Sequence, residues 1–239
     1  MHESRSVGLF LLTGIVGLLL GASIQAQNGE RSADSSAAVA LSSLPKDINP
    51  ESGYRLPLPR RDEMDDYGKK VFDELTDPNR PLRTDLRTPA GIRLYSPTVA
   101  KTMSDALYYL RKETGMGDRL TEIAILVTAR EMDNQYEWSA HERYAQQAGV
   151  EPAIVDIIRY SKPVTGLGEK ETLIITFGRE LFGQKKVSSP TFAEAVRLFG
   201  RRGTVDLASL MGLYSATAAL GNALDIQLPE GRKPSLPPR

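Results

Sequence analysis

The sequence contains no cysteine, which excludes disulfide bonds, thiolate chemistry, cysteine-ligated zinc and attachment of lipid through cysteine. Histidine is scarce as well, because His2 and His141 are the only two in 239 residues. A metal site needs more ligands than one internal histidine and a nearby carboxylate provide. We therefore expect no metal site.

Neither sign of charge predominates. Lysine and arginine together number 30, as do aspartate and glutamate, so the formal net charge is zero. Proteins that bind nucleic acid or anionic membrane surfaces usually carry a basic excess. We therefore expect no nucleic-acid partner. The 41% hydrophobic and 25% charged residues are instead typical of a globular protein with a sizeable core.

The first 26 residues have the composition of a secretory signal peptide. Arg5 precedes an almost wholly apolar run over residues 7–22, and small and polar residues follow it. We predict cleavage after Ala26, and Ser23 is an alternative cleavage site. An uncleaved anchor is the alternative, although the run is a little short for a span, which needs roughly 17–25 residues. We expect an exported protein, periplasmic or secreted, with no other membrane association.

Composition divides the rest of the chain into three parts. Residues 27–59 are polar at first and then proline-rich, which indicates a flexible or extended leader without a core. Residues 60–228 have helical texture and should form the folded domain. Residues 229–239 are rich in proline and glycine, so we expect this tail to fray.

Helical periodicity runs through the predicted domain, and no stretch alternates convincingly with a period of two. Ser96-Pro97 and Ser189-Pro190 each combine a capping residue with a proline in the first turn. Residues 204–224, with Thr204 as the expected cap, are rich in small side chains that allow close helix approach. These patterns predict an all-α, single-domain bundle of about eight helices.

The most informative segment is residues 130–141, which holds the internal histidine and the only tryptophan. Glu137 and His141 are four residues apart, and on a helix this spacing places both side chains on one face. A carboxylate and an imidazole so placed can donate and accept protons near neutral pH. Trp138 flanks them and is a candidate wall for a pocket.

A longer polar stripe is predicted if the helix is continuous. At 100° per residue, the core-facing line of Ile123 and Val127 continues into Arg130, Asn134, Glu137 and His141. Ionisable groups on such a face must be paired, shifted in pKa or functional. A kink near Asp133 would remove Arg130 from this register but would keep Glu137 beside His141. The alternative is a buried polar cluster that only holds helices together.

Three pieces of sequence carry a family resemblance. They are the apolar run 120–127 (LTEIAILV), the pair Ala129-Arg130, and Tyr136-Glu137-Trp138-x-x-His141-x-x-x-Ala145-x-x-x-Gly149-Val150. Tyr95-Ser96-Pro97 and the helix over 204–224 support them. Together they resemble the carboxymuconolactone decarboxylase family, which also contains the alkylhydroperoxidase D proteins, over roughly residues 60–228. The Tyr-Glu-Trp-x-x-His piece is fairly specific, whereas the apolar run is not.

The resemblance points to one branch of that family. In the peroxidase branch two cysteines precede the histidine, with a glutamate upstream, and the matching positions here are Asn134, Glu137 and Glu122. Without thiols, peroxide reduction through a disulfide is not available. The resemblance thus implies the cysteine-free, decarboxylase-like branch: a bundle of the alkylhydroperoxidase D-like type, assembled as homotrimers or homohexamers, with no metal or organic cofactor. A secretory signal is unusual for a decarboxylase of aromatic degradation, so the particular substrate stays open.

The resemblance also suggests roles. The expected substrate is a small carboxylated lactone or related unsaturated acid, and the reaction is decarboxylation or lactone isomerisation. Arg130 is the first choice to hold the carboxylate and Arg93 the second, while His141 suits proton transfer. Glu137 is expected to orient His141 or to take the proton itself, and Glu122 is expected to pair with Arg130 or to act as a second acid. Trp138 and Tyr136 are expected to shape an apolar pocket. Asn134 is a further expected substrate-binding residue.

A second class of function is compatible with the same residues. A non-enzymatic exported helical oligomer that binds a small molecule or a partner, without peroxidase activity, would also lack cysteines and carry a signal peptide. Activity or saturable binding that depends on His141 would separate a functional site from a structural cluster.

Overall fold

The computed structural model describes residues 44–238. The predicted signal peptide and residues 27–43 of the predicted leader lie outside the described residues. Residues from Asp47 onward belong to one structural unit, and the description below concerns this unit. Within the described range, no helix combines the length and hydrophobicity that a membrane span requires.

The all-α fold is confirmed for the described residues, which contain eight α-helices and no strand beyond one isolated bridge between Asn49 and Tyr54. Two short 3-10 turns, η1 (Arg61–Glu63) and η2 (Arg93–Tyr95), accompany them. The α-helices are α2 (Asp66–Thr76), α3 (Pro89–Ile92), α4 (Pro97–Lys112), α5 (Asp118–Glu131), α6 (Gln135–Gln147), α7 (Pro152–Arg159), α8 (Glu169–Gly183) and α9 (Ser189–Ala223).

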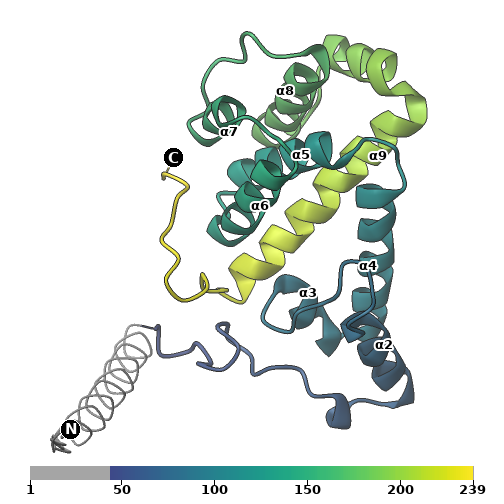
Figure 1. The fold of residues 1–239 in the computed structure, drawn as a ribbon, viewed down its shortest axis with the longest axis vertical. Helices are drawn as coiled ribbons and strands as arrows, with labels where there is room; N and C mark the ends of the chain where they lie inside the picture. The colour runs from purple at the N-terminus through teal and green to yellow at the C-terminus, as the bar shows by residue number, and fades with distance from the viewer. Residues whose placement is uncertain (1–43, 239) are drawn as a thin grey trace, which may run out of the picture. The chain divides into compact units, whose positions relative to one another are not determined.

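Helix α5 forms the centre of the bundle and packs against α6, α7, α8 and α9. Its residues 121–130 are all buried, as the apolar composition predicted. Helix α9 runs diagonally across the molecule, and it contacts α4 on one side and α5 on the other (Figure 1). This arrangement brings the middle of the long C-terminal helix beside α5 and α6, where the predicted site residues lie.

Helix α9 is longer than expected because the segments starting at Ser189 and Thr204 join across a kink. Gly200 has φ 70° and ψ 174°, a conformation that glycine adopts without the steric cost of a Cβ atom. Thr204 is therefore not an N-cap. Its hydroxyl donates to the Gly200 carbonyl at 2.8 Å and stabilises the first turn after the kink.

The helix is interrupted between α5 and α6, so the predicted stripe does not continue along one helix. Asp133 has φ 48°, and Asn134 is the N-cap of α6, where its Oδ1 accepts from the backbone N–H of Glu137 at 2.8 Å. Asparagine and aspartate favour such turns and caps because their side chains bond to nearby backbone groups. The break removes Arg130 from the face that carries Glu137 and His141.

Both ends of the described chain pack on the bundle. Tyr54, within the predicted leader, is fully buried and donates to the carbonyl of Leu86 at 3.1 Å. At the other end, Leu236 is 3% exposed, and its backbone N–H bonds to the Gln135 side chain at 3.1 Å. The tail that we expected to fray is thus docked through residue 237, because Leu236 adds to the apolar core.

Candidate functional site

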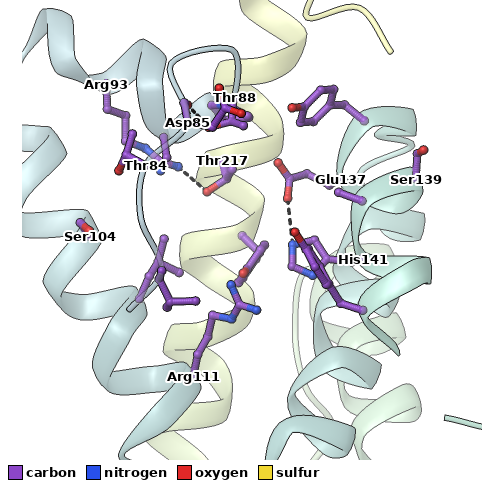
Figure 2. Close-up of a pocket in the computed structure, with 18 of the residues that line it drawn as sticks. Thr84, Asp85, Thr88, Arg93, Ser104, Arg111, Glu137, Ser139, His141 and Thr217 are labelled. Atoms are coloured by element: carbon purple, nitrogen blue, oxygen red, sulfur yellow. Dashed lines mark hydrogen bonds and ion pairs between the residues drawn. The ribbon is translucent and has the colours of Figure 1, made fainter. Parts of the chain in front are cut away.

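A cavity of about 370 Å³ opens between α4, α6, α9 and the segment 82–93 (Figure 2). This volume suits a small molecule. Arg93 and Arg111 reach it from one side, and Glu137 and His141 from the other, with α9 between them. The cavity thus collects side chains that are more than a hundred residues apart in the sequence.

Glu137 and His141 lie where the spacing of four residues predicted, one turn apart on α6. Glu137 is 5% exposed and His141 is 6% exposed. The Oε2 atom of Glu137 lies 3.6 Å from Nε2 of His141, and both residues line the cavity (Figure 2). The pair is therefore buried, adjacent and accessible to a ligand.

Glu122, on α5, meets the other nitrogen of the imidazole. Its Oε2 lies 2.6 Å from Nδ1 of His141, and its Oε1 accepts from Nη2 of Arg111 at 3.1 Å. Because a carboxylate oxygen accepts, Nδ1 is the donor and the ring is held with Nε2 toward Glu137. The expected pairing of Glu122 with Arg130 does not occur, and Arg111 takes that place.

The cavity shifts the protonation equilibrium of Glu137 toward the neutral carboxyl. Burial raises the pKa of Glu137, and the nearby charges of His141, Arg93 and Arg111 only partly oppose this shift. Removal of water disfavours a charged carboxylate, so the neutral form persists to higher pH than for a solvent-exposed glutamate. A neutral buried carboxyl can act as a general acid.

Arg93 supplies a buried cation that is not paired with a carboxylate. It is 6% exposed, and its guanidinium donates to the Thr217 hydroxyl on α9 (Figure 2). Burial lowers the pKa of Arg93, although a guanidinium still stays charged in proteins. Within residues 44–238 no ion pair is formed by Arg93, so its remaining donors are available to an anion.

Three tyrosines complete the walls. The Tyr214 ring lies edge-on to the His141 imidazole at 5.0 Å between ring centres, and the Tyr144 ring lies at 5.6 Å. Burial raises the pKa of both Tyr214 and Tyr136, so these hydroxyls stay neutral. Tyr136 was expected at the pocket, whereas Tyr214 and Tyr144 were not.

Three of the expected substrate-binding residues do not line the cavity. Arg130 donates to the Pro237 carbonyl at 2.6 Å and lies 3.5 Å from Asp133. Asn134 caps α6 and donates to the Asn222 side chain at 2.7 Å. Trp138 is fully buried, and its indole N–H donates to Glu142 at 3.1 Å. The break at Asp133 turns Arg130 toward the C-terminal tail, and all three stabilise the contacts around α6.

Several cavity residues were not predicted from the sequence because they come from other helices. Arg111 ends an ordinary amphipathic helix, and Thr217 and Tyr214 belong to a helix that attracted notice only for its small side chains. No local pattern marks them, and only the packing of α4 and α9 within the bundle reveals them. Arg232, from the tail, is a further unexpected member of the lining.

Among the described residues, no group of three or more histidine, aspartate or glutamate side chains has an arrangement that could hold a metal ion. No protein-family model matches the chain, and no curated protein matches it either. The resemblance to the carboxymuconolactone decarboxylase family stays a prediction from sequence.

Proposed function

We propose that the cavity is the active site of a cofactor-independent acid/base enzyme, similar to carboxymuconolactone decarboxylase, that acts on a small carboxylated lactone or a related unsaturated acid. The observation that carries this proposal is the buried line Glu122–His141–Glu137 beside the unpaired cation of Arg93. An acid, a proton carrier and a carboxylate-binding group are the three components that such a reaction needs.

Arg93, rather than Arg130, is the proposed carboxylate-binding residue. Its guanidinium lines the cavity and is held by Thr217, so the donors are fixed before the substrate enters. Arg111 also lines the cavity, but one of its donors is already bound to Glu122. Arg111 therefore keeps Glu122 in place and adds positive charge to the site.

In the proposed decarboxylation, the bond between the carboxylate carbon and the lactone breaks and carbon dioxide leaves. The electron pair stays on the unsaturated lactone, and the proton of the Glu137 carboxyl bonds to carbon. His141, oriented by Glu122, then returns a proton from solvent to Glu137. Isomerisation of a double bond would use the same groups, with removal and return of a proton and no loss of carbon dioxide.

A panel of unsaturated lactone acids tests this function. Product and carbon dioxide would be measured by NMR for the wild type, for His141→Gln and for Arg201→Gln, an exposed control outside the cavity. The proposal expects turnover in the wild type and the control, and a loss of about 100-fold in His141→Gln. Saturable binding without turnover in the wild type would instead favour the non-enzymatic, ligand-binding class.

Assembly and export belong to the same proposal. Helix α9 exposes Val205, Ser209, Gly212, Ala216 and Ala219 at spacings of three and four residues, which is a smooth face that a second subunit could approach closely. The family resemblance adds a homotrimer or homohexamer. The N-terminal composition supports secretion or a periplasmic location.

A further inference from the structure

The mouth of the cavity carries cations that the proposed chemistry does not use. Arg143, on α6, and Arg232, on the tail, both line the cavity, and with Lys233 they also line an adjoining shallow groove. Within the described chain, no ion pair is formed by any of these three residues. Glu142 lies in the groove, but it pairs with Arg159.

The balance of charge around the whole cavity is positive. Its lining includes four arginines: Arg93, Arg111, Arg143 and Arg232. The two acids of the lining are Asp85, which is exposed, and Glu137, whose pKa is raised by burial. A ligand with a single carboxylate, bound at Arg93, would leave Arg143 and Arg232 at the mouth without an anionic partner.

Arg232 is held in place rather than free in solvent. Its Nη1 donates to the carbonyl of Ser139 at 2.8 Å and to the Ser139 hydroxyl at 3.1 Å. Beyond it, the tail is fixed by burial of Leu236, by the Gln135 side chain and by the Arg130 bond to Pro237. These contacts give Arg130 a structural role and make the tail part of the cavity wall.

We propose that Arg143 and Arg232 form a second anion subsite at the mouth, so that the ligand is an elongated dianion. The inner carboxylate lies at Arg93, as in the proposed function on which this inference rests, and the outer anionic group lies between Arg143 and Arg232. Planar guanidinium groups suit a carboxylate or a phosphate as the outer group. Arg232 thereby becomes a specificity-determining residue supplied by the C-terminal tail.

The two subsites differ in their exposure, which sets how each responds to salt. Arg143 and Arg232 are exposed, whereas Arg93 is buried. Exposed ion pairs contribute little each and are screened by salt, so we expect the outer group to improve affinity about five- to tenfold at low ionic strength. This gain should shrink as the salt concentration rises, while binding at Arg93 should change less.

Calorimetric titration of the full chain with matched probes tests the subsite. The probes are linear dicarboxylates of increasing length, monocarboxylates of the same lengths, and ω-phosphono acids to compare a phosphonate with a carboxylate as the outer group. Each is titrated at ionic strengths of about 0.01 M and about 0.15 M. The variants are Arg93→Gln, Arg143→Gln and Arg232→Gln, with Arg201→Gln as the exposed control.

The expected result is that a dicarboxylate or phosphono acid of suitable length binds about five- to tenfold more tightly than its monocarboxylate. Arg143→Gln and Arg232→Gln should each reduce the ratio of dianion affinity to monocarboxylate affinity toward one, without weakening binding of the monocarboxylate. Arg93→Gln should weaken binding of every probe. Arg143 forms no hydrogen bond or ion pair with the described part of the tail, and its guanidinium instead donates to the Tyr144 hydroxyl at 3.4 Å. Its variant therefore tests the subsite even if Arg232→Gln loosens the tail.

Three other results would contradict the subsite. If monocarboxylates bind through Arg93 and no dianion binds more tightly at any length, the subsite does not exist and the proposed function survives. If the ratio is unchanged in Arg143→Gln and in Arg232→Gln, these arginines are not its source. Absence of binding by every probe would contradict both the subsite and the carboxylate-binding role of Arg93.

Discussion

The Oε2 atom of Glu122 lies 2.6 Å from Nδ1 of His141, although the two residues are 19 positions apart and belong to different helices. The turn between α5 and α6 folds the second helix against the first, and this brings the two side chains together. The contact sets the orientation of the imidazole and leaves Nε2 toward Glu137 and the cavity. It is the relationship on which the proposed chemistry depends.

The first prediction concerns His141. The His141→Gln variant largely keeps size and hydrogen bonding but removes titration near neutral pH. It should fold and assemble normally and lose about 100-fold in turnover, the scale for one acid/base group. The turnover rate per folded molecule measures this loss, and the temperature of thermal unfolding is the control for correct folding. A stable and fully active variant would show that the polar line is only a contact between helices.

The second prediction concerns Glu122, which acts through His141. Glu122→Gln removes the charge that Arg111 and His141 share, so we expect unfolding to become easier by about 1–3 kcal/mol. Turnover should fall about 10- to 100-fold, because the imidazole loses its orientation. Urea unfolding and the pH profile of turnover measure the two effects. Glu113→Gln, an exposed change nearby, is the control and should alter neither.

The third prediction concerns the pH dependence of stability through Glu137. Burial raises its folded-state pKa, so the folded chain binds the proton more strongly than the unfolded chain. The corresponding stability is fully present below the unfolded pKa, about 4.3, and is lost as pH rises through the folded pKa.

The Glu137→Gln variant cannot lose this proton. Its free energy of unfolding relative to the wild type should therefore increase as the pH rises above about 4. Urea titrations of both proteins across this range measure the difference. A constant difference would mean that the carboxyl titrates alike in both states, which contradicts its assignment as a buried acid.

The fourth prediction concerns the tail. Leu236 is 3% exposed within the main core, so Leu236→Ala should destabilise the protein by about 2 kcal/mol, near the low end for buried leucine. Hydrogen exchange at the backbone amides of Arg232, Lys233 and Ser235 and at position 236 should accelerate in this variant. Leu82→Ala, at a more exposed leucine, is the matched control. An unchanged exchange rate would show that Leu236 does not hold the tail.

The fifth prediction concerns assembly through α9. Ala216→Glu places a charge in the middle of the exposed face of small residues, where a neighbouring helix would exclude water. Light scattering should show a trimer or hexamer for the wild type and smaller species for this variant. Lys186→Glu, on an exposed loop, should leave the mass unchanged. A monomeric wild type at micromolar concentration would end this hypothesis.

The sequence by itself was enough to determine the fold class and the central polar pair. Helical periodicity, proline-containing helix starts and the apolar helix over 120–130 are local signals, and each appears in the structure. Glu137 and His141 are adjacent because a spacing of four on a helix places them so in any tertiary arrangement. Asp133-Asn134 also marked a possible break, because both residues favour caps.

Only the tertiary structure decided which other groups meet that pair. The break at Asp133 directs Arg130 to the tail, and the packing of α4 and α9 brings Arg111, Thr217 and Tyr214 to the cavity. The tail packs because Leu236 finds an apolar site that its proline-rich composition does not reveal. Contacts between distant segments depend on how the helices cross and which faces they bury. A local sequence pattern does not show which residue of one helix will contact which residue of another.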